Sequence, residues 1–156
     1  VSSLPANEFL LLEGKPMSKS EGWFLDLDTL LTKVEADVIR YLMAAVAPEN
    51  SDSNLCWEDF LNHNNQGLVG QFGNLIYRTL SFIDKRNLHV AEKATDILFW
   101  ETWWKEVDTC YAQHQSRALC QQIMSACRQL NAYFDQTAPW KLFKEDPEKL
   151  PTVLAN

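Results

Sequence analysis

The chain has 156 residues, of which 46% are apolar and 12% aromatic, and its formal net charge is −7. It is too hydrophobic for a disordered tail, and no apolar run is long enough to cross a bilayer. Nonspecific nucleic-acid binding depends on many Lys/Arg–phosphate contacts, so the acidity excludes a broad basic footprint but permits a local RNA site. At this length we expect one domain, or one domain plus a fragment. The chain opens at Val1 without a methionine, and we expect this start to be a cut or processed end.

Residues 1–33 have a different residue pattern from the rest of the chain. Phe9–Leu12 predicts a strand, and Trp23–Leu27 predicts a second extended segment after a polar stretch. These segments are too short to form a domain by themselves. They predict a small non-helical appendage at the amino terminus.

From Ala36 onward the pattern is helical, apart from a polar loop expected at Glu49–Asn54. Pro139 suits the first turn of a short helix, and Pro151 suits the start of another. We therefore expect a mainly α fold, in which the helices form an antiparallel bundle. The longer predicted helices are Asp37–Ala47, Trp57–Lys85, Val90–Gln113 and Arg117–Gln136.

The cysteines and histidines predict no metal site. No C-x-x-C pair occurs, and no histidine spacing resembles a metal site or a nucleophile relay. We expect reduced cysteines that pack as small apolar residues, and a cytoplasmic chain. The residues concerned are Cys56, Cys110, Cys120, Cys127, His63, His89 and His114.

A Ser/Lys loop lies between Gly14 and Gly22. It presents two hydroxyls, an ammonium group and several backbone N–H groups. Such a segment can follow the oxygens of a polyphosphate, with lysine supplying a mobile charge. The alternative from spacing alone is a polar surface turn.

One face of the predicted helix 57–85 carries small residues around an Asn/Arg pair. Three glycines each cost about 1 kcal/mol relative to alanine in a helix interior, so a compensating role is expected. Two interpretations remain: a tight helix–helix contact, or a flat platform for a planar ligand. The face comprises Gly67, Gly70, Asn74, Arg78 and Ser81, with Gly73 near it.

The opposite side of that helix predicts a packing stripe, formed by Val69, Phe72, Ile76 and Ile83. Tryptophans at helical spacing further along the chain also favour packing over a second stacking surface. These are Trp100, Trp103 and Trp104, with Trp57 as a further anchor.

The loop Met17-Ser18-Lys19-Ser20 resembles the K-M-S-K-S signature of class I aminoacyl-tRNA synthetases, which holds the ATP phosphates during amino-acid activation. The resemblance implies that Lys19 is the catalytic-loop lysine, which stabilises charge as pyrophosphate leaves. With Lys15, the four residues would form the ATP-phosphate loop.

The loop departs from the family pattern at two positions. The family's first lysine falls on Pro16, and Glu21 stands where a basic residue is frequent. Both changes weaken phosphate binding. The resemblance implies ATP and Mg²⁺ as cofactors of a complete enzyme, with none expected in this fragment.

A second resemblance is to the anticodon-reading region of methionyl-tRNA synthetases. It rests on Leu68-Val69-Gly70, Gly73-Asn74-Leu75 and Arg78, and later on Asn131-Ala132-Tyr133 and Ala138-Pro139-Trp140. The resemblance implies that Asn74 and Arg78 contact anticodon bases, while Trp140 stacks on one. Pro139 would fix the approach of Trp140.

Together these resemblances imply that residues 1–33 end a class I catalytic region and that residues 34–156 form a helical anticodon-binding domain. The expected partners are the tRNA anticodon loop and, in the complete enzyme, methionine and ATP; neither DNA nor a membrane is expected. Since the chain has no H-x-G-H segment, it should not aminoacylate alone. The alternatives are a class I synthetase of another amino-acid specificity, or a helical interaction module without an RNA function.

Overall fold

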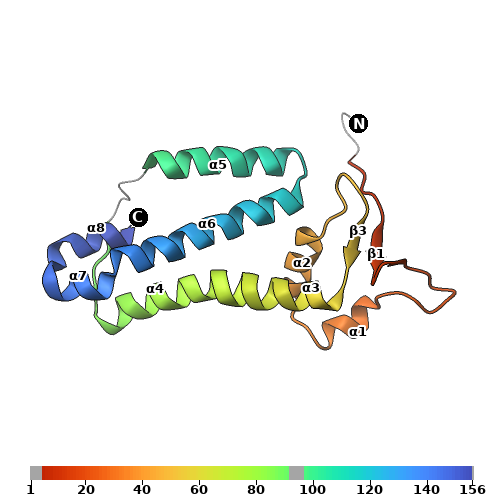
Figure 1. Cartoon of the computed structure of the whole chain (residues 1–156), viewed down its shortest axis with the longest axis horizontal. Helices are drawn as coiled ribbons and strands as arrows, with labels where there is room; N and C mark the ends of the chain where they lie inside the picture. The colour runs from red at the N-terminus through yellow and green to blue at the C-terminus, as the bar shows by residue number, and fades with distance from the viewer. Residues whose placement is uncertain (1–4, 92–96, 156) are drawn as a thin grey trace.

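The computed structural model of the chain describes residues 5–91 and 97–155. The sheet, α1 and α2 lie at one end of the molecule, and α7 and α8 lie at the other (Figure 1). The elements in chain order are β1 (Leu10–Leu12), β2 (Lys15–Pro16), α1 (Leu27–Leu31), α2 (Ala36–Ala45), β3 (Ser53–Leu55), α3 (Trp57–Asn62), η1 (His63–Gly73), α4 (Asn74–Lys85), α5 (Ile97–Ala112), α6 (Ser116–Thr137), α7 (Pro139–Glu145), η2 (Pro147–Lys149) and α8 (Leu150–Ala155).

The mainly helical architecture is confirmed, and the helix boundaries follow the predictions closely. The part of Val90–Gln113 that covers residues 92–96 lies outside the described residues, and α5 begins at Ile97. Pro139 occupies the first turn of α7, as expected. None of the helices in the described part of the chain is both long and apolar enough to cross a membrane.

The predicted helix 57–85 is a continuous helical run made of α3, η1 and α4. Its middle stretch, η1, is π-helical, a form whose hydrogen bonds join residues five apart. Gly70 and Gly73 lie in this stretch, where an added Cβ would approach the carbonyl oxygens of Asn65 and Leu68 to 3.0 Å. The wider turn therefore favours glycine at both positions.

Gly67 has a different role, because it is the point at which η1 meets α2. It is buried, and a Cβ at this position would lie 2.8 Å from the hydroxyl oxygen of Tyr41. The tight helix–helix contact, one of the two interpretations of the glycine face, is thus confirmed for Gly67.

The long helix and α6 run in the same direction, because α5 returns the chain between them (Figure 1). The contacts Gln71–Arg128, Asn74–Asn131 and Arg78–Asp135 all join residues 57 positions apart, as two parallel helices require. The expected antiparallel order therefore applies to the long helix with α5 and to α5 with α6, but not to the long helix with α6.

The expected packing stripe on the long helix is wrong. Val69, Phe72 and Ile76 are exposed, with Val69 at 61%, and only Ile83 is half-buried. The physical reason is that α6 packs against the polar and glycine side, where Asn74 and Arg78 find hydrogen-bond partners.

The amino-terminal segment forms a three-stranded sheet in the order β2-β1-β3. β1 pairs with β2 in antiparallel and with β3 in parallel orientation. β3 lies partly where a loop was expected, since its pairing with a strand some 40 residues away leaves no local signal. Asp52 fixes the edge by accepting a hydrogen bond from the backbone N–H of Phe9 at 2.9 Å.

The expectation of a wholly non-helical appendage is corrected at Leu27–Leu31, which form α1. Asp26 caps this helix by accepting a hydrogen bond from the N–H of Thr29 at 2.9 Å. Trp23 alone retains extended pairing, through an isolated bridge to Ser18. The predicted extended segment 23–27 therefore ends where the cap begins.

Two small apolar cores secure the two ends of the molecule. The first joins the sheet to α2 through Leu12, Leu42, Val46 and Leu55. The second joins α4, α6 and α8 through Phe82, Phe134 and Leu150. The second core lies directly beneath the residues expected to read RNA.

The four cysteines are free thiols, and burial raises the pKa of Cys120 and Cys127.

Gly67→Ala should destabilise the chain by about 1–2 kcal/mol. Overpacking against Tyr41 costs about 1–3 kcal/mol, and the better helix propensity of alanine returns up to about 1 kcal/mol. In a Tyr41→Phe background the clashing oxygen is absent, and the next ring atom lies 3.6 Å from the added Cβ. Urea unfolding of the four chains measures the coupling; equal effects in both backgrounds would contradict this contact.

Candidate RNA-binding site

Asn131 of α6 is the centre of a hydrogen-bond network between α6 and the long helix. Its Nδ2 donates to the carbonyl oxygens of Cys127 at 2.9 Å and of Gln71 at 3.1 Å. Its Oδ1 accepts from Asn74 Nδ2 and from Arg78 Nη1, each at 3.5 Å. Because both carbonyls require a donor, the amide orientation is determined, and its oxygen faces Asn74 and Arg78.

Arg78 is held on three sides. Besides Asn131, it forms an ion pair with Asp135, and its guanidinium carbon lies 4.4 Å from the ring centroid of Phe134. The Arg78 hydrogen bond holds the pKa of the Asp135 carboxyl below its usual range. The Arg78 side chain is 24% exposed, so part of it still reaches solvent.

Trp140 reaches the same place from α7. Ala138 has a φ of 43°, so the chain turns sharply after α6, and the buried Pro139 starts the new helix. The Trp140 ring then lies 6.0 Å from that of Phe134, at an interplanar angle of 47°. Trp140 is 39% exposed, which leaves ring surface open for stacking.

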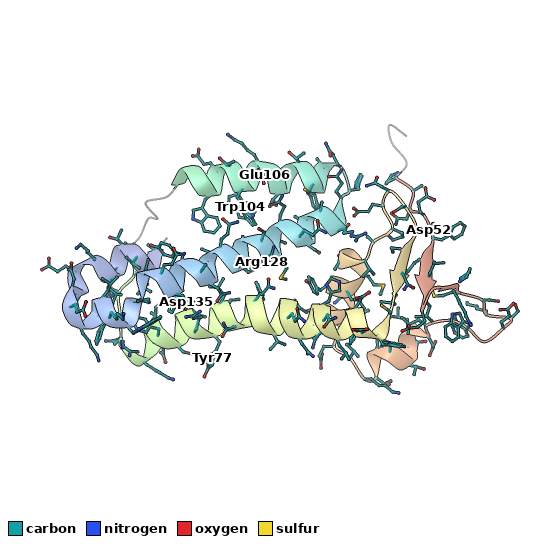
Figure 2. All side chains as sticks on the ribbon, viewed as in Figure 1. Asp52, Tyr77, Trp104, Glu106, Arg128 and Asp135 are labelled. Carbon is teal, nitrogen blue, oxygen red and sulfur yellow. The ribbon has the colours of Figure 1, made fainter. Side chains whose placement is uncertain are left out.

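Phe134 therefore contacts both Arg78 and Trp140. Asn74 is exposed one helical turn from Arg78, so all three predicted base-contacting residues gather around Phe134 and Asn131. Asp135 lies on the side of α6 that faces α4, whereas Tyr77 of α4 projects away from α6 (Figure 2). The arrangement brings an indole, an amide and a guanidinium to neighbouring positions on α4 and α7.

Sequence reasoning did not assign contact roles to Asn131, Phe134 or Asp135. Asn131 belongs to a quoted motif, but its hydrogen bonds to the long helix cross 53 to 60 residues of chain and have no local signal. Phe134 and Asp135 follow at the spacing that shares its helix face, which is the one clue the sequence contains.

The Ser/Lys loop is a tight hairpin at the other end of the molecule (Figure 1). Ser18 and Trp23 exchange two backbone hydrogen bonds of 2.7 and 2.9 Å, so residues 19–22 form the tip. Gly22 adopts a φ of 69°, which favours glycine, and its N–H donates to the Lys19 carbonyl oxygen.

The exposed Lys19 projects from this tip, with the hydroxyls of Ser18 and Ser20 3.1 Å apart beside it. Lys15 lies at the base of the hairpin, its ammonium 5.5 Å from the centroid of the Trp23 ring, and Met17 is exposed. The predicted phosphate-loop residues thus lie on consecutive residues from β2 to the 18–23 hairpin, far along the chain from the Asn74/Arg78 face.

The remaining tryptophans pack only in part. Trp103 contacts both Trp100 and Trp104, but Trp104 is more than half exposed. Trp57 meets Phe60 edge-to-face and is 46% exposed. Among the described residues, no three His, Cys, Asp or Glu side chains gather as metal ligands.

Comparison with known proteins places the chain in a family. The family model described as class I tRNA synthetases (M) matches residues 1–80. The methionine–tRNA ligase of Chlamydia pneumoniae is 42% identical over 99% of this chain and 30% of its own length. That of Chlamydia muridarum is 40% identical over 94% of this chain and 28% of its own.

A solved methionyl-tRNA synthetase of Mycobacterium tuberculosis, in complex with methionyl-adenylate, superposes with a TM-score of 0.81 at 27% identity. The match covers 96% of this chain and 32% of that one. The chain thus spans about three-tenths of the length of the curated relatives it matches. Family model, relatives and fold agree that the chain belongs to the methionyl-tRNA synthetases of class I.

Proposed function

We propose that this chain binds the anticodon loop of a tRNA, through the face formed by Asn74, Arg78 and Trp140. The observation that carries the proposal is their convergence on Phe134 and Asn131 of α6 from two separate helices, α4 and α7. Trp140 stacks on one base, which is worth about 1–3 kcal/mol. Asn74 and Arg78 select bases by hydrogen bonding, with a paired donor and acceptor and a planar fork.

The distribution of charge supports this local mode of binding. Residues 57–91 and 113–156 contain eight Lys/Arg and seven Asp/Glu, so the acidity of the chain lies elsewhere. RNA approaching the α4–α6–α7 side meets a nearly neutral surface. A few exposed groups then suffice for recognition of splayed bases.

The preorganised Arg78 side chain is the second observation that supports the proposal. Asp135 and Asn131 fix the Arg78 guanidinium before any ligand arrives, so little side-chain entropy remains to be lost on binding. The helical region 34–156 is accordingly proposed as an anticodon-binding domain, and residues 1–33 as the end of a catalytic region.

For the complete enzyme we propose methionine–tRNA ligase activity, in which the hairpin 14–22 contacts ATP phosphates. Lys19, Ser18 and Ser20 fit that task, since the exposed Lys19 stands in sequence between two hydroxyls that lie 3.1 Å apart. ATP with Mg²⁺ would supply the adenylyl group that methionine receives at its carboxylate, with pyrophosphate as the leaving group. Pro16 offers no N–H and no charge, which leaves Lys15 as the nearest second cation.

Trp140→Ala should weaken binding of a CAU anticodon stem-loop about 5- to 150-fold, the equivalent of one lost base stack. Trp57→Ala is the matched control, since Trp57 has similar exposure and also a single ring contact at 6.0 Å. Fluorescence anisotropy with CAU and changed-anticodon loops measures both. Equal affinity of the unmodified chain for the two loops would sink the proposal.

The isolated chain should form no methionyl-adenylate, because the hairpin supplies phosphate contacts without the bulk of a nucleotide-binding fold. Methionine-dependent pyrophosphate exchange is the assay, with a full-length relative as the positive control. Exchange above background in the isolated chain would overturn the division of labour proposed here.

Arg78→Gln should raise the pKa of Asp135 toward its ordinary range. Because the folded pKa is depressed, the ion pair stabilises the fold above the ordinary aspartate pKa and is lost as the pH falls through the folded value. The destabilisation caused by Arg78→Gln should therefore shrink in acid. NMR titration of the Asp135 carboxyl carbon measures the shift; an unchanged midpoint would show that Arg78 is not its cause.

A further inference from the structure

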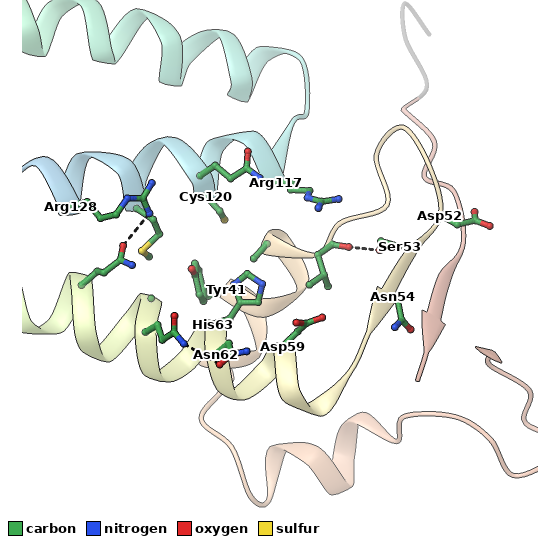
Figure 3. A pocket seen from close by; sticks show the side chains of 17 residues that line it. Tyr41, Asp52, Ser53, Asn54, Asp59, Asn62, His63, Arg117, Cys120 and Arg128 are labelled. Atoms are coloured by element: carbon green, nitrogen blue, oxygen red, sulfur yellow. Dashed lines mark hydrogen bonds between the residues drawn. The ribbon is translucent and has the colours of Figure 1, made fainter. Parts of the chain in front are cut away.

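A polar cavity of about 640 Å³ lies where α2, β3, the start of the long helix and α6 meet (Figure 3). Its α6 wall includes Arg117, Gln121, Met124 and Arg128. These positions alternate by four and three residues and so share one helix face. Continuing the same alternation along α6 gives Asn131 and Asp135, which belong to the candidate site.

Hydrogen bonds connect the cavity directly to that site. The side-chain oxygen of Gln71 accepts from Arg128 at 3.3 Å, while its backbone carbonyl accepts from Asn131 at 3.1 Å. Gln71 and Arg128 line the cavity, whereas Asn131 contacts Asn74 and Arg78. The cavity and the base-reading face are therefore neighbouring stretches of one seam between the long helix and α6.

Charge is unevenly distributed around the cavity. Arg117 and Arg128 extend from α6, whereas Asp52 and Asp59 stand on the β3 and α3 side (Figure 3). Both carboxylates accept hydrogen bonds from within the fold. Asp52 accepts one from the backbone N–H of Phe9, and Asp59 accepts one from the Cys56 thiol at 2.7 Å.

The α6 side keeps unused donors. Glu49 accepts from the backbone N–H of Arg117 at 2.9 Å. Within the described chain, neither the Arg117 guanidinium nor the Gln121 amide has a hydrogen-bond partner. The α6 wall thus offers a guanidinium and an amide whose hydrogen-bond donors have no partner among the described residues.

The spacing of the two arginines indicates which ligand these donors could bind. Eleven residues separate the two arginines, about 16 Å along a helix. Two guanidiniums at that separation on one face suit an extended chain of phosphates, and the amides nearby suit base edges. The cavity also continues a face already proposed to bind an RNA loop.

We propose that this cavity holds the RNA strand that continues from the anticodon, with Arg128 and Arg117 pairing with its phosphates. The inference rests on the proposed function, since the strand is positioned by the bases held at Asn74, Arg78 and Trp140. It assigns to the chain a phosphate-binding track that runs from the base-reading face along α6 toward the sheet.

The test is the salt dependence of binding to the CAU stem-loop. Each lost phosphate contact lowers the slope of log K against log salt by about 0.7–0.9. The Arg117→Gln/Arg128→Gln chain should therefore lose about 1.4–1.8 of slope and keep its preference for CAU. The Lys/Lys counterpart retains the charge and should keep most of the slope; Arg40→Gln, on the exposed side of α2, should change nothing.

The outcomes separate the two proposals. An unchanged slope in the double Gln variant, with the CAU preference intact, would overturn the phosphate track and leave the anticodon site standing. If Trp140→Ala lowered the slope and the double Gln variant did not, the phosphate contacts would lie at the base-reading face and not in the cavity. That result would also overturn the phosphate track. Absence of any CAU preference in the unmodified chain would remove the anticodon site and the track together. Circular dichroism of each variant establishes that it is folded.

Discussion

The seam between the long helix and α6 depends on the side-chain amide of Asn131. Its two donor bonds to backbone carbonyls fix the rotamer, and its oxygen is thereby aimed at Asn74 and Arg78. Arg78 then lies on the Phe134 ring, against which Trp140 also packs. A polar contact between helices thus does two things: it sets the parallel register of the pair and it arranges the surface that faces solvent.

That dependence explains why the apolar side of the helix is left outside. Val69, Phe72 and Ile76 would satisfy an ordinary amphipathic helix by turning inward, yet they remain exposed because α6 meets the glycine side. Gly67 allows the close approach of Tyr41 of α2, while Gly70 and Gly73 fit the π-helical geometry of η1. The glycines offset their propensity cost through packing and backbone geometry, while Asn74 and Arg78 form the hydrogen bonds to α6.

The sequence predicted the extent of the helices well, because periodicity, acidic first turns and prolines are local signals. Pro139 and the run from Trp57 to Lys85 are examples. It failed where distant residues decide the outcome: β3 forms by pairing with β1, and α6 chooses the face of α4. For the site, resemblance supplied Asn74, Arg78 and Trp140. The residues that join them, Asn131, Phe134 and Asp135, emerged only when α6 was placed beside α4.

The central claim is that Trp140, Asn74 and Arg78 form one RNA-binding face. The most direct measurement is an NMR titration of the isotope-labelled chain with a CAU anticodon stem-loop, following the Trp140 indole N–H and the Asn74 side-chain amide. Both signals should shift together, at the same RNA concentration, and a loop with a changed anticodon should leave them where they are. Shifts confined to α5 or the amino-terminal sheet, or identical shifts with both loops, would contradict the account.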